Sequence, residues 1–426
     1  MKKIFLFICF SLIISKVAYG QAQEENENGV NEIYKKIPLK SEITSVQPMT
    51  GIVLRTDHAD NLTDAISLEF SYMLFKDVVK EKDVYDWSGV DKLLDEVASR
   101  KHHAIFRFRF VWPGDKESGM PLYIRNLPDY EETIALSEGR ETCFPDWRHP
   151  ELQRFYLDFY RRFAERYDND KRLAFLQVGF GLWGEYHLYQ GPLEIGRTFP
   201  SMEFQKKFLL EMSQNFKITP WSISKDAASP VYSPFSENIE LKNLKFGLFE
   251  DSFMHESHAL YNTTCLNFFG RNRYKQSPIG GEFGFYTRYD QEHVLDYPDG
   301  IHGRNFETEA YNFNVTYMVG NNQTRYQTLE RIKQASMACG YRYKILDFRA
   351  SEEKSLVLVK NTGVAPIYYD AYIVVNGLRS NDSLKKLQPG EETWYEVELG
   401  GANLTLTIEC DYLVKGQKIE FEANIK

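Results

Sequence analysis

The sequence is poor in cysteine, and its cysteines lie far apart. Five are spread over 426 residues, with neither the dense spacing of a disulfide-stapled scaffold nor the close pairs of a zinc site. Up to two disulfides are allowed and none is required. The sequence therefore predicts no metal site.

Positive charge and long apolar runs are also scarce. The formal net charge at pH 7 is −9, and a surface of this sign repels the phosphate backbone of nucleic acids. No run reaches the roughly 18 apolar residues that a membrane-spanning helix needs. We expect no nucleic-acid partner, no membrane span and no obligatory protein partner.

The N-terminus has the pattern of a secretory signal peptide. Met1-Lys2-Lys3 precedes a mainly apolar run over residues 4–14, and small residues end at Gly20. This order of charge, apolar run and small residues is that of a cleaved export signal. We predict a signal peptide over residues 1–20, and export to the periplasm or the cell exterior.

Residues 21–45 begin as a polar, acidic stretch without periodicity, which predicts a disordered leader. From residue 46 to 342, apolar β-rich runs alternate with helical patterns, as in parallel α/β folds. Eight candidate strands in this length predict a (β/α)8 TIM-type barrel, which typically needs about 250 residues; a doubly wound open sheet is the alternative. The candidate strands are Ile52–Arg55, Ala65–Leu74, His103–Trp112, Leu173–Gly179, Ile218–Ile223, Lys245–Phe249, Ser277–Gly281 and Val315–Val319.

The sequence pattern changes over residues 343–426. Short alternating runs such as Ser355-Leu-Val-Leu-Val are separated by turn signals such as Asn376-Gly377. This pattern is typical of a small antiparallel β-sandwich. Because no low-complexity linker precedes it, we expect the sandwich to pack directly on the barrel.

A chemically distinctive segment follows the fourth candidate strand. It reads Gly181-Leu-Trp-Gly-Glu-Tyr-His, and the end of a barrel strand is where active sites lie. Trp183 offers a flat apolar face and Glu185 a carboxyl group beside it, the two features that a sugar ring needs. The plain alternative is that Glu185 is a loop glutamate or an ion-pair partner.

Gly179-x-Gly181-x-x-Gly184 also matches the dinucleotide-binding fingerprint. That motif requires a helix N-terminus over the pyrophosphate, whereas bulky residues fill this loop and Gly196 and Pro200 follow before the next helical pattern. We therefore predict no cofactor.

A second carboxyl group follows the seventh candidate strand, in Pro278-Ile-Gly-Gly-Glu. Glycoside hydrolysis usually employs two carboxyl groups that flank the scissile bond. Glu185 and Glu282 would face each other across the mouth of the barrel, with Glu185 as general acid/base and Glu282 as nucleophile. Asp251, at the end of the sixth strand, is the rival second carboxylate.

These placements resemble the retaining barrel glycosidases whose catalytic glutamates follow strands four and seven. More narrowly, Gly181 to His187, Gly280-Gly-Glu and Val359-Lys-Asn-Thr-Gly-Val-Ala-Pro-Ile-Tyr resemble an uncharacterised family of secreted bacterial proteins, a domain of unknown function with a glycosidase-like barrel. The resemblance covers residues 50–426 and implies fold and site position. One departure stands out: the glycosidases place Asn before the acid/base, whereas this chain has Gly184.

Further substrate contacts are predicted from neighbouring strand ends. Two arginines share a face of the third strand, acidic residues follow the first and sixth, and aromatic and imidazole side chains adjoin both glutamates. The predicted substrate-binding residues are Trp183, Tyr186, His187, Arg107, Arg109, Asp57, Asp251 and Tyr286.

The function predicted from sequence is that of a secreted glycoside hydrolase that acts on an oligo- or polysaccharide with retention of configuration, so that the predicted partner is a carbohydrate substrate. The alternatives are a non-catalytic carbohydrate-binding protein on the same barrel and a structural envelope protein. Sugar, linkage, oligomeric state and the role of the sandwich are not encoded in any motif of the sequence.

Overall fold

The computed structural model describes residues 34–426. The predicted signal peptide and most of the predicted leader lie outside the described residues. Among residues 34–426, no helix has the length and apolar character needed to cross a membrane. The four cysteines of this range are buried and unpaired.

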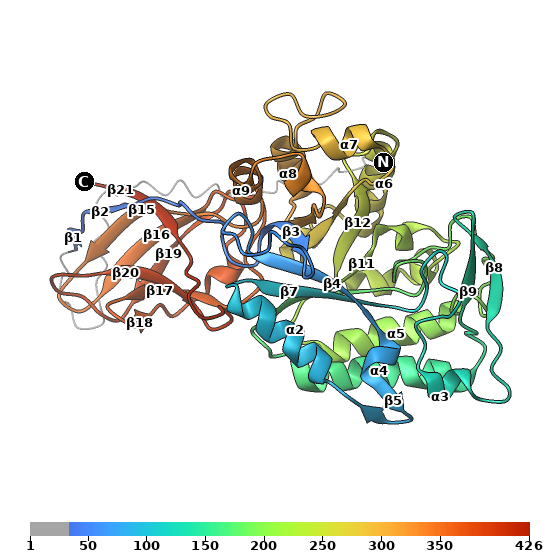
Figure 1. The fold of residues 1–426 in the computed structure, drawn as a ribbon. Helices are drawn as coiled ribbons and strands as arrows, with labels where there is room; N and C mark the ends of the chain where they lie inside the picture. The colour runs from blue at the N-terminus through green and yellow to red at the C-terminus, as the bar shows by residue number, and fades with distance from the viewer. Residues whose placement is uncertain (1–33) are drawn as a thin grey trace, which may run out of the picture.

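Eight parallel strands close into a barrel (Figure 1). The order around the barrel follows the chain, and the last strand pairs with the first. This closure confirms the TIM-type barrel, and all eight predicted strands are present. They are β3 (Gly51–Arg55), β4 (Leu68–Leu74), β7 (His103–Arg109), β10 (Leu173–Val178), β11 (Trp221–Ser224), β12 (Gly247–Phe253), β13 (Ile279–Phe283) and β14 (Tyr317–Val319).

Helices cover the outside of the barrel, and α4 shows how the sequence specifies them. His149 caps its N-terminus by accepting from the amide of Glu151, and Pro150 occupies the first turn, where proline is tolerated. Its apolar stripe is buried against the strands. The α-helices are α1 (Phe75–Val78), α2 (Ser88–Ser99), α3 (Leu122–Arg125), α4 (Pro150–Tyr167), α5 (Met202–Asn215), α6 (Ala259–Phe269), α7 (Arg288–His293), α8 (Phe306–Phe313) and α9 (Leu329–Met337).

Shorter elements decorate the loops. Two hairpins project from the barrel, and seven single-turn 3-10 helices lie among the described residues. The hairpins are β5 (Val79–Glu81) with β6 (Val84–Tyr85) and β8 (Thr133–Ser137) with β9 (Arg140–Phe144). The 3-10 helices are η1 (Lys225–Ala228), η2 (Pro234–Ser236), η3 (Ile239–Asn243), η4 (Glu256–His258), η5 (Arg273–Lys275), η6 (Gln323–Arg325) and η7 (Leu384–Lys386).

The C-terminal residues form the predicted sandwich of two packed sheets, in which most strand pairs are antiparallel. Alternate residues of β16 are buried, as expected of a strand with one face on a core. One sheet runs β19-β16-β15-β21-β2 with β1 on β15, and the other runs β18-β17-β20. The strands are β15 (Tyr343–Ala350), β16 (Ser355–Asn361), β17 (Ala371–Val375), β18 (Leu378–Arg379), β19 (Glu392–Val397), β20 (Leu406–Cys410) and β21 (Phe421–Ile425).

The leader prediction is wrong from residue 35 onward. β1 (Lys35–Lys36) pairs with β15, and β2 (Leu39–Ser41) pairs with β21. The chain is then held where the amides of Thr44 and Ser45 donate to Glu420, at 2.7 and 2.9 Å. Strands of two and three residues have no periodicity to detect, so their order comes from partners distant in sequence.

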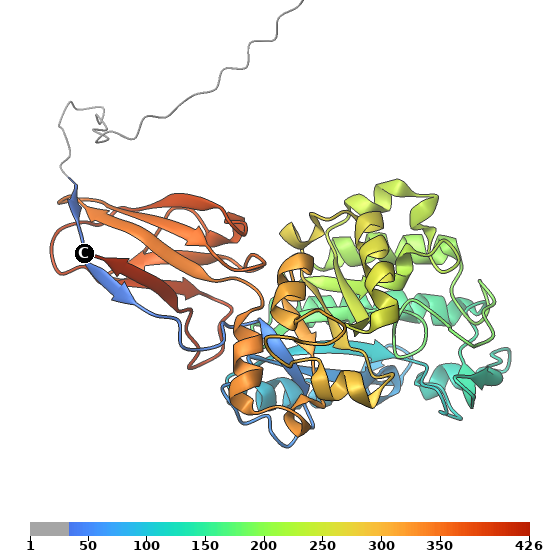
Figure 2. The same cartoon turned by 90° about the horizontal axis from the view of Figure 1, so that it is seen from above.

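The sandwich packs against the N-terminal ends of the barrel strands (Figures 1 and 2). The Tyr369 hydroxyl donates to the carbonyl of Ala174, at 2.6 Å, where β10 begins. His103, the first residue of β7, contacts Gln417 at 2.6 Å. The expected direct packing is confirmed, and the opposite, C-terminal mouth of the barrel is left open.

Candidate active site

A cavity of about 490 Å³ opens at the C-terminal mouth, within the size range of small-molecule sites. Aromatic side chains and carboxyl groups together make up most of its lining. The aromatic side chains are Phe70, Tyr72, Trp112, Trp183, Phe285 and Tyr286, and the acidic ones are Glu138, Glu185, Asp251 and Glu282.

Glu185 is presented by a tight turn after β10. The amides of Phe180 and Gly181 both donate to the Glu185 carbonyl, at 3.0 and 2.7 Å. Gly184 has φ 76°, and a β-carbon there would lie 2.8 Å from the Phe108 carbonyl oxygen. Only glycine fits this contact without displacement. The packing of the turn against β7 thus accounts for the missing asparagine.

Arg107 lies beneath both glutamates. Its Nη1 donates to Glu185 Oε1 at 2.5 Å and lies 3.6 Å from Glu282 Oε1. Its Nε donates to Gln177, whose amide nitrogen in turn donates to the Tyr317 hydroxyl, both at 2.7 Å. This chain of hydrogen bonds inside the barrel holds the Arg107 guanidinium in place. The two carboxyl groups therefore share one cation in a fixed position.

The two glutamates differ in how tightly they are held. The other oxygen of Glu185 lies 3.1 Å from His187 Nε2, and the residue is only 2% exposed. Glu282 rises from β13 with a side chain that is 15% exposed. Because both contact the same nitrogen of Arg107, their nearest oxygens are separated by no more than the sum of 2.5 and 3.6 Å, about 6.1 Å.

Burial and neighbouring charges shift the pKa values of the three central carboxyl groups, Glu185, Asp251 and Glu282, by different amounts or in different directions. Burial raises the pKa of Glu282 to about 8, with Arg107 opposing and Glu185 reinforcing the change. Burial also raises the pKa of Glu185, against Arg107 and His187. For Asp251, burial is outweighed by Lys225 and the imidazoles, which hold its pKa below the ordinary value. The site therefore combines a carboxyl group that holds its proton with carboxylates that lie close to cations.

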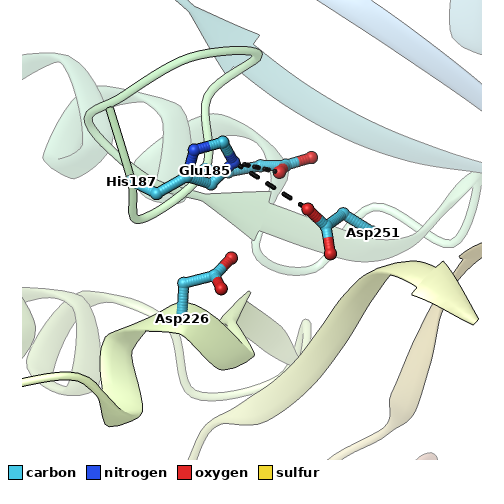
Figure 3. Close-up of side chains that lie close together, drawn as sticks. All are labelled: Glu185, His187, Asp226 and Asp251. Atoms are coloured by element: carbon cyan, nitrogen blue, oxygen red, sulfur yellow. Dashed lines mark hydrogen bonds and ion pairs between the residues drawn. The ribbon is translucent and has the colours of Figure 1, made fainter. Parts of the chain in front are cut away.

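Figure 3 shows Glu185 with three side chains that converge on it, those of His187, Asp226 and Asp251. Their potential ligand atoms all lie within 4.8 Å of one another, and this nitrogen and oxygen set could hold a divalent ion. Asp251 Oδ1 also lies 3.4 Å from Lys225 Nζ, which supplies positive charge at the same place. Glu185 and His187 follow β10, Asp226 follows β11 and Asp251 lies in β12. The spacing rules that predicted no metal could not detect residues so far apart in the sequence.

Hydroxyl groups hold Asp226 in this cluster. Tyr189 and Tyr261 donate to its Oδ1 at 2.8 and 2.9 Å, and Ser224 donates to its Oδ2 at 2.6 Å. Burial acts to lower the pKa of His187, but Glu185, Asp226 and Asp251 outweigh it and raise the value. A protonated His187 can therefore donate to Glu185.

Five predicted site residues face the cavity, and Arg107 and His187 support them from behind. Glu185, Glu282, Trp183, Asp251 and Tyr286 line it. Arg107 and His187 are each 1% exposed, so they act through the carboxyl groups that they contact and have little surface to offer a substrate.

Besides Arg107 and His187, three further predicted substrate-binding residues lie outside the cavity lining. Tyr186 is fully buried, with its ring against those of Phe180 and Phe199. Arg109, two residues after Arg107 along β7, forms an ion pair with Asp115 at 3.1 Å. Asp57 is largely exposed and lies 3.6 Å from Arg55. In each case the correct strand end was predicted but the side-chain direction was not.

Other cavity residues were not predicted. Trp112 follows the third strand, and Asn321 and Asn322 follow the eighth, positions that the strand-end rule could have identified. Glu138 reaches the cavity from the β8–β9 hairpin. The hairpin is an insertion between a strand and a helix of the barrel, and it is not part of the alternating strand and helix pattern. Its position over the mouth could therefore not be predicted from the sequence.

No family model matches the chain, and no curated protein sequence matches it. The narrower resemblance to a domain of unknown function stays a prediction. Similar solved structures include an alpha-galactosidase from Thermus thermophilus with p-nitrophenyl alpha-D-galactopyranoside (12% identity, TM-score 0.40, 74% of this chain and 66% of that one). A GH36 alpha-galactosidase from Geobacillus stearothermophilus with stachyose has 12% identity and TM-score 0.35 over 82% of this chain and 55% of that one.

A third structure, CbXyn10B in native form, has 10% identity and TM-score 0.38, over 63% of this chain and 82% of that one. This chain thus spans 66% and 55% of the length of the first two proteins.

Proposed function

We propose that the protein is an exported glycoside hydrolase that acts on an oligo- or polysaccharide. The observation that carries this proposal is the pair of carboxyl groups from the fourth and seventh barrel strands, Glu185 and Glu282, which contact one arginine in an aromatic-walled cavity. Acid and nucleophile beside flat apolar faces are what hydrolysis of a glycosidic bond requires.

The proposed reaction proceeds with retention of configuration. Retaining enzymes hold their carboxyl groups about 5 to 5.5 Å apart, whereas inverting enzymes need roughly 6.5 to 9.5 Å to admit a water molecule. The contacts of both groups with one nitrogen of Arg107 limit the distance between their nearest oxygens to about 6.1 Å, which is compatible with the retaining arrangement. Asp251 is a neighbouring charge in this proposal, close to His187 and Lys225.

We assign the roles in the reverse of the order suggested by the sequence. With a pKa of about 8, Glu282 holds a proton at neutral pH and can act as general acid. Glu185 has the closer contact with Arg107, 2.5 against 3.6 Å, so it ionises first and can act as nucleophile.

The reaction then proceeds in two displacements. Glu282 gives its proton to the glycosidic oxygen while Glu185 attacks the anomeric carbon, which breaks the bond to the leaving group and forms a glycosyl ester. Ionised Glu282 next takes a proton from a water molecule, whose oxygen attacks the same carbon. The sugar leaves, Glu185 is again a carboxylate, and Arg107 stabilises it.

A non-catalytic carbohydrate-binding protein is the second candidate. Both oxygens of Glu185 are occupied by Arg107 and His187, and the residue is 2% exposed, an arrangement that also suits a structural ion pair. Such a protein would bind glycans through the aromatic walls and would release no product.

The deciding experiment is a hydrolysis screen of 4-nitrophenyl glycosides and polysaccharides with the wild type, Glu185→Gln and Glu282→Gln. We expect product from the wild type only, with each variant at least about a hundredfold slower. Glu309→Gln, a buried glutamate on α8 away from the cavity, is the matched control. Glycan binding with no product from any form would replace the enzyme with the binding protein.

Azide separates the two roles. With an activated aryl glycoside, Glu282→Ala should form a glycosyl azide of retained configuration, and Glu185→Ala one of inverted configuration. The opposite pattern would restore the original assignment, with Glu185 as acid/base.

A further inference from the structure

A second cavity, of about 430 Å³, lies beside the first on the same mouth of the barrel. Its lining includes His255, Glu256, Ser257, Tyr289, Asp290 and His302, from the segments that follow β12 and β13, α7 among them. Tyr286 joins the two cavities: it lines the first, and its ring centre lies 4.8 Å from that of His255 in the second.

Two aromatic faces mark the path from one cavity to the other. Tyr286 and Tyr289 are 63% and 55% exposed; Tyr286 precedes α7, and Tyr289 is its second residue. Exposed aromatic rings bordered by polar groups are typical of ligand-binding surfaces. A tyrosine ring presents a flat apolar face at low conformational cost, and the C–H face of a pyranose fits such a surface.

The polar groups of the second cavity are held in fixed positions. Asp290 is only 4% exposed, and its two oxygens lie 2.8 Å from His302 Nε2 and 3.6 Å from His255 Nε2. The other nitrogen of His255 contacts the Ser257 hydroxyl at 2.8 Å. A buried carboxylate thus orients two imidazoles that come from separate loops.

The chemistry of these groups favours a neutral, hydroxyl-rich ligand over an ion. Within residues 34–426, this cavity does not bring three metal-ligating atoms within 4.8 Å of one another, whereas the cluster at Glu185 does. Imidazole nitrogens, a hydroxyl and carboxylate oxygens offer both donors and acceptors. Sugar hydroxyls match such a set around an aromatic face.

We infer that the second cavity is a glycan subsite, which binds a neutral sugar ring one or more units away from the bond at Glu185 and Glu282. The inference rests on the proposed function, and it deepens it: the substrate class is an extended oligosaccharide or polysaccharide that passes over Tyr286 to Tyr289. A simple monosaccharide glycoside would fill the first cavity alone.

The kinetic test compares short and long substrates of the same sugar. We expect Tyr289→Ala to raise KM for a tetrasaccharide to hexasaccharide about tenfold, the loss of one stacked ring. The same variant should leave kcat/KM for the 4-nitrophenyl monosaccharide unchanged. Tyr311→Ala, an exposed tyrosine on α8 outside both cavities, is the matched control. Equal effects on short and long substrates would overturn the subsite.

A binding test separates the subsite from the enzyme activity. Glu185→Gln protein, with and without Tyr289→Ala, is titrated by calorimetry against cello-, xylo-, manno- and galacto-oligosaccharides. Tighter binding by the protein that retains Tyr289 supports the subsite. This outcome counts for the subsite even if no hydrolysis is found and the proposed function fails. Equal binding by both forms overturns the subsite even if hydrolysis is found. If no oligosaccharide binds, both proposals fall.

Discussion

Arg107 sets the protonation of the two glutamates at the centre of the site. One guanidinium faces two carboxyl groups, and all three are withdrawn from water. Ionising both carboxyl groups would leave an uncompensated buried charge, which is costly. The pair therefore keeps one proton, and the closer contact of Arg107 with Glu185 directs that proton to Glu282.

The raised pKa of Glu282 makes stability depend on pH. Its folded pKa of about 8 lies above the ordinary value of 4.5, so the folded state binds this proton more tightly than the unfolded chain. The associated stabilisation is complete below pH 4.5 and is lost as the pH rises through 8. Glu282→Gln should therefore gain stability relative to the wild type at alkaline pH, on the order of a few kcal/mol.

The measurement is urea unfolding of both proteins at pH 5, 7 and 9. We expect the free energy of unfolding of Glu282→Gln to exceed that of the wild type most at pH 9 and least at pH 5. A difference that stays constant over this range would mean that Glu282 ionises as an ordinary glutamate.

Gly184 illustrates a residue whose identity is set by packing. Restoring the glycosidase pattern with Gly184→Asn places a β-carbon 2.8 Å from the Phe108 carbonyl oxygen. Asparagine tolerates the positive φ, so the cost comes from the contact with β7, about 1 to 3 kcal/mol. We expect a lower free energy of unfolding and no gain in activity.

Gly139→Asn is the matched control, because Gly139 has φ 69° and open space around its Cβ position. Chemical unfolding of both variants separates the backbone effect from the clash. Equal stability of the two would show that the turn can shift and that packing does not require glycine at 184.

The barrel strands are the elements that the sequence predicted best. Runs such as Leu173–Val178, buried throughout, are apolar on both faces because the barrel interior lies on one side and helices on the other. Strand ends then placed Glu185, Asp251 and Glu282 at one mouth, since parallel strands finish at the same end. Fold and carboxyl positions followed from these two rules.

Elements without periodicity account for what the sequence did not predict. Lys225 and Asp226 lie in η1, in a stretch without helical pattern, yet Asp226 belongs to the cluster beside Glu185 and Lys225 contacts Asp251 of that cluster. The turn after β10 has no alternation of apolar and polar residues that would indicate where each side chain points. Tyr186 was therefore predicted to face the site together with its neighbours. Local patterns give the order of elements, whereas side-chain direction in turns depends on tertiary packing.

The whole molecule divides its tasks between the two ends of the barrel. Both cavities lie at the C-terminal mouth, and the sandwich covers the N-terminal ends of the strands. One apolar cluster includes Phe175 and Tyr317 of the barrel together with Tyr368, Tyr369 and other sandwich residues. A shared core of this kind predicts that the two parts unfold together.

Tyr369→Ala tests this coupling at the interface. The ring is buried, and its hydroxyl donates to the Ala174 carbonyl at 2.6 Å, so truncation should cost about 3 to 5 kcal/mol. Calorimetry should show one transition in the wild type and one, at a lower Tm, in the variant. Tyr372→Ala, on the half-buried face of β17, should shift Tm much less. Two separate transitions in the wild type, or loss of only one of them in Tyr369→Ala, would show instead that barrel and sandwich are independent units held together by surface contacts.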